Sequence, residues 1–214
     1  MSPSRRTVIA GLSAVALTTS GCLSRSDDGD TSDPHPTMGE SFPTLGPDPD
    51  AAEATVVAFE DPSCGSCSVF ADRTFPRLRA LAEEGRLSYR WCGLPWVEPW
   101  SEPAVQALFE VHGRDPAAFW ELKSRYYAAQ DRLENGTIYG YTTEALSQIG
   151  IDPDPIDSAM VERTHTGRVE RHEKLAEDSE IEQVPSFALF ADGEFVSTVV
   201  GAQAYDVFEG ALEL

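Results

Sequence analysis

The sequence predicts an α/β domain, on the basis of three stretches of hydrophobic pattern. An apolar run at residues 55–59 indicates a buried strand, and an alternating segment at residues 87–92 indicates a second. Near the C-terminus, residues 186–200 contain two apolar runs around an Asp-Gly turn, which is typical of a β-hairpin. Between the second strand and the hairpin, at about residues 102–179, only helical spacing is convincing. We therefore expect a sheet whose connectivity is interrupted by a helical block.

Two cysteines follow the first strand directly. The stretch Asp61-Pro62-Ser63-Cys64-Gly65-Ser66-Cys67 leads from that strand into a helix predicted over residues 69–82. Cys64 is expected at the helix N-terminus, where partial positive charge and free N–H groups favour a thiolate. Pro76 falls inside this helix and is expected to kink it. A cysteine pair at this position can close and reopen a small disulfide ring.

The later elements follow from capping signals and turns. The second strand is expected to lie parallel to the first. In the helical block, Asp115 is a candidate N-cap followed by proline at the first helical position. A further helix is predicted to start at Thr142 and end at Gly150. Pro153–Pro155 is predicted to open one long polar helix that reaches about Asp178, and residues 203–212 are predicted to form the final helix.

The chain resembles the DsbA-like branch of the thioredoxin superfamily over residues 55–214. Phe59, Asp61, Cys64 and Cys67 match the Phe-x-Asp-x-x-Cys-x-x-Cys pattern of that branch. The segment Gln183-Val184-Pro185-Ser186-Phe187 resembles the loop that carries the cis-proline of the family, and it precedes the expected hairpin and helix.

The resemblance implies a thioredoxin fold with a helical domain inserted between the second strand and the cis-proline loop. It also implies a catalytic site made of Cys64, Cys67 and Pro185. In this interpretation Cys64 exchanges disulfides with the substrate, Cys67 resolves the mixed disulfide, and the Val184 backbone binds an extended substrate segment. No bound cofactor and no metal are expected.

The sequence departs from the family pattern at two places. Ala58 stands where many relatives carry a buried acid, six residues before the first cysteine. Glu60 points to the same side of the strand, because side chains alternate with period two, and it is the candidate proton relay. The alternative for Glu60 is a solvated or salt-bridged surface acid. Gly65-Ser66 lacks the His that strongly oxidising relatives often have, so the redox direction stays open.

The N-terminus resembles an export signal. Arg5-Arg6 precedes an apolar segment at residues 8–17 and the small residues that lead to Cys22. We expect a twin-arginine lipoprotein signal at residues 1–21, with Cys22 as the lipid anchor. The alternatives are an uncleaved hydrophobic tail or a cleaved signal with an unmodified Cys22. Residues 22–52 are acidic and rich in Pro and Gly, and are expected to be a flexible tether to a domain spanning 53–214.

Composition restricts the class of partner. Lys plus Arg total 16 and Asp plus Glu total 36, a net charge of −20, which argues against nucleic acid. Only Lys123 and Lys174 are lysines, and this pattern resembles proteins of halophiles. The alternative is a merely acidic, well-solvated surface.

The expected location is the outer side of the cell membrane. The expected partners are exported protein thiols or disulfides and a membrane redox protein.

Several further residues have two interpretations. Cys92 is expected to be a buried, small apolar residue, with a third redox thiol as the alternative. His112, His165 and His172 do not share a metal-ligand spacing with the cysteines. Seven aromatic residues are expected mainly to form the packing interface between the helical block and the core. The alternative is that these residues line a groove for the substrate. They are Trp91, Trp96, Trp100, Phe119, Trp120, Tyr126 and Tyr127, of which Trp96 and Trp100 are the expected exposed ones.

The sequence thus predicts a thiol–disulfide oxidoreductase outside the cytoplasm that forms or reshuffles disulfides through Cys64 and Cys67. Two alternatives are a reductase that supplies electrons to exported proteins or cytochrome assembly, and a non-catalytic binding lipoprotein on the same scaffold. A metal site formed by Cys64, Cys67 and Cys92 is weaker, because no fourth ligand is placed nearby.

Overall fold

The computed structural model describes residues 42–214. The predicted signal at residues 1–21, the anchor Cys22 and most of the expected tether lie outside the described residues. The elements, in chain order, are β1 (Thr44–Leu45), the 3-10 helix η1 (Pro49–Ala51), β2 (Ala54–Glu60), α1 (Gly65–Arg73), α2 (Phe75–Glu83), β3 (Leu87–Gly93), α3 (Ser101–Arg114), α4 (Pro116–Ala129), η2 (Gln130–Arg132), α5 (Ile138–Gln148), α6 (Asp154–Glu162), α7 (Thr166–Asp178), β4 (Ser186–Ala191), β5 (Glu194–Val200) and α8 (Tyr205–Leu212).

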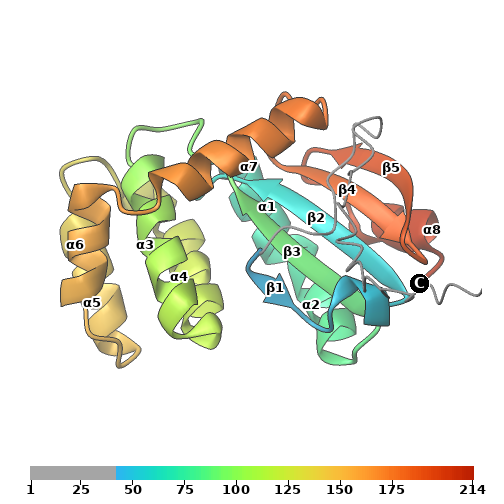
Figure 1. Cartoon of the computed structure of the whole chain (residues 1–214), viewed down its shortest axis with the longest axis horizontal. Helices are drawn as coiled ribbons and strands as arrows, with labels where there is room; N and C mark the ends of the chain where they lie inside the picture. The colour runs from blue at the N-terminus through green and yellow to red at the C-terminus, as the bar shows by residue number, and fades with distance from the viewer. Residues whose placement is uncertain (1–41) are drawn as a thin grey trace, which may run out of the picture. The chain divides into compact units, whose positions relative to one another are not determined.

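The described strands form one sheet in the order β1-β3-β2-β4-β5 (Figure 1). β2 and β3 run parallel, with Ala54 opposite Leu87 and Glu60 opposite Gly93. β4 is antiparallel to β2, and β5 is antiparallel to β4. The predicted α/β class is confirmed, and so is the insertion of the helical block between the second predicted strand and the C-terminal hairpin.

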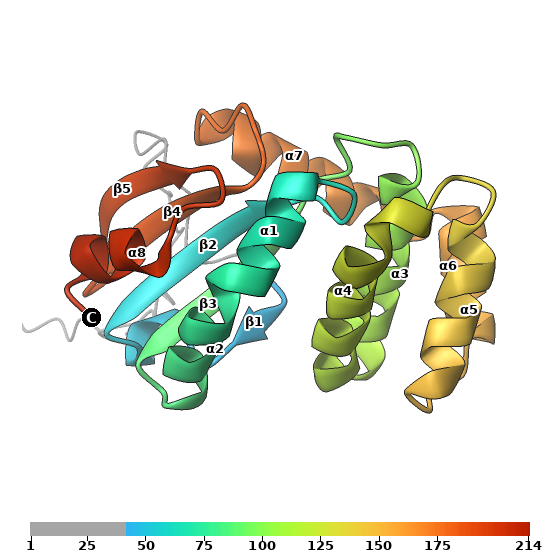
Figure 2. The same ribbon diagram turned by 180° about the vertical axis from the view of Figure 1, so that it is seen from behind.

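Helices cover both faces of the central strand β2, which is buried along its whole length. Val56 and Ala58 belong to the large core cluster that includes Phe70 of α1 and Phe208 of α8, on the face seen in Figure 2. Val57 and Phe59 point the other way, into a cluster with Ala176 of α7 and Phe42. A strand covered on both faces reads as a continuous apolar run, which is the pattern found at 55–59.

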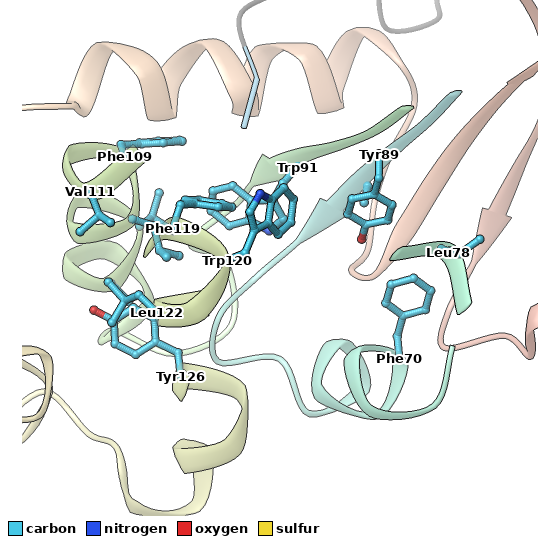
Figure 3. Close-up of a cluster of buried hydrophobic side chains, with 14 of the residues drawn as sticks. Phe70, Leu78, Tyr89, Trp91, Phe109, Val111, Phe119, Trp120, Leu122 and Tyr126 are labelled. Carbon is cyan, nitrogen blue, oxygen red and sulfur yellow. The ribbon is translucent and has the colours of Figure 1, made fainter. Parts of the chain in front are cut away.

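An aromatic seam joins the helical block to the sheet. Trp91 of β3 packs edge-on against Phe109 of α3 and Phe119 of α4, with ring centroids 5.8 and 5.2 Å apart. Figure 3 shows Trp91, Phe119 and Trp120 gathered between the strand and the helices. Aromatic pairs of this kind add specific geometry to the apolar burial. Core packing is therefore the main role of the aromatic residues. Trp96 is 38% exposed as predicted, but the predicted exposure of Trp100 is wrong, since it is 4% exposed.

The expected tether ends earlier than predicted. β1 pairs with β3 through Thr44 and Leu45, and the Phe42 side chain is buried beneath the Arg90 guanidinium and beside His172. Residues 42–45 of the expected tether therefore pack on the sheet, and the Pro-rich residues that follow lead to η1. A two-residue strand is too short for its alternation to be seen in the sequence.

Two predicted helices are each divided into two. The first breaks at Thr74, and Pro76 lies in the first turn of α2 rather than inside a kinked helix. Proline cannot donate the helical hydrogen bond, and its ring excludes the carbonyl one turn earlier. The long helix predicted up to Asp178 is α6 and α7, because Arg163 adopts a left-handed conformation (φ 54°) that ends α6. The helix predicted to start at Thr142 begins at Ile138, one turn earlier.

Candidate active site

Cys64 is the N-cap residue of α1, and its backbone is extended rather than helical. Its Sγ accepts a hydrogen bond from the Cys67 backbone N–H at 3.2 Å. The Cys64 side chain is 5% exposed, whereas Cys67, one turn into the helix, is completely buried. Sulfur thus takes the place of the oxygen that usually caps a helix N-terminus, and the helix end stabilises negative charge on that sulfur.

The cis-proline loop lies against this thiol. The Val184–Pro185 peptide bond is cis, and the Cys64 Sγ donates to the Val184 carbonyl oxygen at 3.4 Å. Val184 also packs against the cluster formed by Cys64, Cys67 and Tyr127. The fold therefore brings Val184 and Pro185 to the cysteine pair across 120 residues of sequence.

The two thiols differ in acidity. The hydrogen bond from the Cys67 side chain lowers the pKa of Cys64 below the ordinary thiol value, against the opposing effects of burial and the Asp61 charge. Burial raises the pKa of Cys67 far above that value, and the hydrogen bond with Cys64 and the Glu60 charge act in the same direction. Because the thiolate is the nucleophilic form of cysteine, the lower pKa favours Cys64 over Cys67 as the attacking sulfur.

Glu60 is completely buried at the end of β2. Its carboxylate accepts hydrogen bonds from the hydroxyl of Tyr89 and, at 2.5 Å, from that of Tyr127. The Lys123 ammonium lies 2.9 Å from the same carboxylate, in a salt bridge whose two side chains are 3% and 0% exposed. The alternative of a surface acid is therefore wrong. The structure places Glu60 where its charge acts on Cys67.

Lys123 comes from α4 of the helical block and is surrounded by aromatic rings. Its ammonium lies 4.8 Å from the Phe75 ring centroid and 5.0 Å from that of Tyr127, with Tyr89 and Trp120 slightly further away. Sequence reasoning missed this residue. The available signal was its rarity, because a chain with only two lysines has placed one of them amid apolar helical residues.

Asp61 is the second buried carboxylate of the site. Its oxygens accept hydrogen bonds from the Ser63 N–H, the Ser101 hydroxyl and the N–H groups of Trp96 and Val97, at 2.6 to 2.7 Å. The family pattern contained this residue, but the pattern alone did not reveal that Asp61 ties the cysteine loop to the segment after β3.

Cys92 lies on the other side of the sheet. It is paired with Phe59 in the β2–β3 ladder and belongs to the cluster under α7, where its Sγ donates to the His172 carbonyl oxygen at 3.8 Å. The structure therefore does not bring Cys92 to Cys64 and Cys67. Within residues 42–214 no three His, Cys, Asp or Glu side chains are grouped to hold a metal ion.

The three histidines have structural contacts. His172 Nδ1 accepts from the Gly93 N–H at 3.0 Å, and burial lowers the pKa of His172 to about 3, so this imidazole is neutral. His165 Nε2 lies 2.8 Å from a Glu110 carboxylate oxygen, and His112 packs edge-on against Phe119.

A curated relative resembles the chain in sequence. Disulfide bond formation protein D of Bacillus subtilis (strain 168) is 27% identical over 147 residues, which are 67% of this chain and 65% of that protein. The chain thus spans slightly less than two thirds of the length of this relative.

Solved structures resemble the fold. BdbD from Bacillus subtilis, in its oxidised form, has a TM-score of 0.67 at 23% identity, covering 80% of this chain and 91% of that one. The thiol-disulfide exchange protein alpha-DsbA2 from Wolbachia pipientis has a TM-score of 0.65 at 18% identity, covering 80% and 86%. The thioredoxin family model matches residues 48–213, which include every element of the sheet except β1. The chain belongs to the thioredoxin family.

Proposed function

We propose that this protein is a thiol–disulfide oxidoreductase that forms or reshuffles disulfides in exported proteins through Cys64 and Cys67. The observation that carries the proposal is the position of Cys64, which caps α1, has a lowered thiol pKa and faces the cis Val184–Pro185 bond. The names of the relatives, a disulfide bond formation protein and a thiol-disulfide exchange protein, point to the same chemistry.

In the oxidising direction the reaction starts from the Cys64–Cys67 disulfide. A substrate thiolate attacks Cys64 Sγ, the disulfide breaks, and Cys67 leaves with the electron pair and takes up a proton. A second substrate thiolate then attacks the substrate sulfur of the mixed disulfide and displaces the Cys64 thiolate. The substrate loses two electrons and gains a disulfide, and the protein becomes a dithiol. In the reverse direction Cys64 attacks a substrate disulfide and Cys67 resolves it.

Glu60 is proposed to exchange the proton of Cys67 during these steps. The proton has to move at a completely buried sulfur, and Glu60 is the buried carboxylate whose charge acts on it. Lys123, Tyr89 and Tyr127 hold the carboxylate in place through one ion pair and two hydrogen bonds. Such partners offset the desolvation of a buried charge.

Val184 and Pro185 are proposed to receive the substrate chain. The Val184 carbonyl, which contacts Cys64 Sγ, would pair with a backbone N–H of an extended substrate segment. Pro185 has no N–H, so it presents no donor to the thiols.

The location and partners belong to the same proposal. The protein is exported by the twin-arginine route, held at the outer face of the membrane by a lipid on Cys22, and reoxidised by a membrane redox protein. The acidic, lysine-poor composition fits an origin in high salt. Within residues 42–214 no helix is long and apolar enough to cross a membrane. Replacement of Cys22 by Ser should release the protein from the membrane fraction, and retained membrane association would contradict the anchor.

Refolding of scrambled ribonuclease and reduction of insulin test the chemistry. Cys64→Ser should abolish both activities, Cys67→Ser should accumulate mixed disulfides, and the control Cys92→Ala should leave both activities in place. Full activity in Cys64→Ser would refute the catalytic assignment. The reduction potential decides the direction: about −120 mV indicates an oxidant and about −270 mV a reductant.

A further inference from the structure

The Gln130 side chain connects the helical block to the backbone of the cysteine loop. Gln130 follows the last residue of α4 and begins η2. Its Nε2 donates to the Pro62 carbonyl oxygen at 2.8 Å and to the Cys64 carbonyl oxygen at 3.0 Å. These acceptors lie 68 and 66 positions away in the sequence. One amide group therefore binds the two peptide units that flank the Ser63-Cys64 dipeptide.

A second set of contacts joins the same end of α4 to α1, and both helices face the viewer in Figure 2. The Ser68 hydroxyl of α1 donates to the Tyr127 carbonyl oxygen at 3.2 Å. The Tyr127 side chain forms a buried cluster with Cys64 and Cys67. Its hydroxyl donates to the Glu60 carboxylate at 2.5 Å. The end of α4 thus contacts the cysteine pair through backbone, side chain and hydroxyl, and the Gln130 amide lies next to these contacts in the chain.

The environment of the Cys64 sulfur depends on the backbone of this loop. The sulfur accepts from the Cys67 N–H at 3.2 Å because Cys64 is an extended N-cap residue at the start of α1. The hydrogen bonds from the Cys67 side chain and backbone lower the pKa of the Cys64 thiol. Hydrogen bonds weaken steeply as donor and acceptor lose alignment. A loop that is free to rotate would therefore stabilise charge on this sulfur less well.

The two redox forms need this restraint to different degrees. In the structure Cys64 and Cys67 are a dithiol, and hydrogen bonds and packing hold the loop, among them the two bonds from Gln130. In the disulfide form the Cys64–Cys67 bond is a covalent restraint on the same residues. The dithiol therefore depends on the Gln130 amide more than the disulfide does, and the amide stabilises the dithiol preferentially.

We propose that Gln130 is a positioning residue for the redox pair: its amide ties the Pro62 and Cys64 carbonyls to the helical block and thereby holds the Cys64 sulfur at the end of α1 in the dithiol form. This inference rests on the proposed function, and it adds a residue of the inserted helices that sets the redox equilibrium of the cysteines. The amide is neutral, so it acts through the position of the loop rather than through charge.

Gln130→Met is the primary test, because Met has the same length as Gln and no N–H group. Gln130→Glu is a second variant, which keeps the size and polarity of the side chain but turns oxygen atoms toward the two carbonyls. Gln148→Met is the matched control. Gln148 belongs to the same helical block, and its exposed amide donates to the Glu144 carboxylate at 3.1 Å on the surface of α5.

The measurement is the equilibrium of the cysteine pair with glutathione, read from the fraction of alkylated thiols by mass spectrometry. Oxidised glutathione takes two electrons and two protons from the dithiol, which gives the protein disulfide and two molecules of reduced glutathione. Gln130→Met should shift this equilibrium about tenfold toward the disulfide, a fall of about 30 mV in the reduction potential. Gln130→Glu should shift it in the same direction, and Gln148→Met should match the wild type.

Unfolding of the two redox forms distinguishes positioning from a general effect on stability. In Gln130→Met the urea midpoint of the dithiol should fall more than that of the disulfide form. The Cys64 thiolate, followed by absorbance at 240 nm, should form at higher pH than in the wild type. A role in stability alone would lower both midpoints equally and leave the glutathione equilibrium and the thiolate titration unchanged.

A wild-type glutathione equilibrium in Gln130→Met, or a shift toward the dithiol, overturns the inference and leaves the proposed function intact. Should Gln130→Met not fold, an unshifted equilibrium in Gln130→Glu overturns it in the same way. A wild-type protein whose cysteine pair does not exchange with glutathione refutes the proposed function, and this inference with it.

Discussion

The Lys123 ammonium of the helical block lies 2.9 Å from the Glu60 carboxylate at the end of the central strand, and neither side chain reaches solvent to more than 3%. This contact links the inserted helices directly to the carboxylate whose charge acts on Cys67. The pair is a structural link between the helical block and the sheet, and it adjoins the cysteine pair.

Removal of one partner of this pair should be strongly destabilising. Lys123→Met leaves the Glu60 charge buried without its counter-charge, and we expect the free energy of unfolding to fall by about 3–5 kcal/mol. Urea titration followed by circular dichroism measures it. Lys174→Met is the matched control, because Lys174 is exposed and pairs with Asp178 on the surface of α7, and it should leave stability unchanged. Equal stability of the two variants would contradict a buried pair.

Glu60→Gln should alter the chemistry of Cys67 more than that of Cys64. The Glu60 charge raises the pKa of Cys67, so its removal should lower that pKa and change the pH dependence of mixed-disulfide resolution. The measurement is the pH profile of the release of a peptide from Cys64 in single-turnover kinetics. Glu98→Gln, at an exposed acid of the neighbouring loop, serves as the control. An identical profile in Glu60→Gln would exclude Glu60 from the proton transfer.

Cys67→Ala should make Cys64 less acidic. The hydrogen bond from the Cys67 side chain is the largest cause of the lowered Cys64 pKa, so its loss should raise that pKa toward the ordinary thiol value. Alkylation of Cys64 by iodoacetamide at pH 7 should slow accordingly, because the thiolate is the reactive form. The Cys92→Ala variant, altered on the other side of the sheet, should alkylate at the wild-type rate. Unchanged alkylation in Cys67→Ala would assign the acidity to the helix end alone.

Buried His172 should make the fold sensitive to mild acid. Burial lowers its pKa to about 3, below the ordinary value near 6.5, so the unfolded chain binds the proton more readily. The neutral His172 contributes its full stabilisation of the fold above about pH 6.5, and this stabilisation is lost as the pH falls toward 3. By pH 5 the loss amounts to about 2 kcal/mol in the free energy of unfolding. Urea unfolding at pH 7 and pH 5 measures the difference.

His172→Asn is the comparison for this effect, because its amide oxygen can still accept from the Gly93 N–H and does not titrate. The difference in stability between pH 7 and pH 5 should shrink by about the same 2 kcal/mol in this variant. An undiminished pH dependence would assign the acid sensitivity to other groups.

The sequence could predict the parts of the site whose signal is local. The strand at 55–59, the cysteine spacing and the Val184-Pro185 segment lie within short windows, so residue type and periodicity were sufficient to locate them. The same holds for the cap at Asp115, which accepts from the N–H groups of Ala117 and Ala118. Where a break carries no glycine or proline, as at Arg163, local pattern failed, because a left-handed residue of this kind is imposed by its surroundings.

By itself, then, the sequence determined the α/β class, the inserted helices and the positions of Cys64, Cys67 and Pro185. Only the tertiary structure decided that Glu60 is buried against Lys123, that Asp61 holds Trp96, and that Trp100 is interior while Trp96 is exposed. The first two facts depend on contacts between residues 63 and 35 positions apart in the sequence. The burial and the electric environment of a side chain depend on which distant groups the fold places around it, and no local pattern encodes that placement.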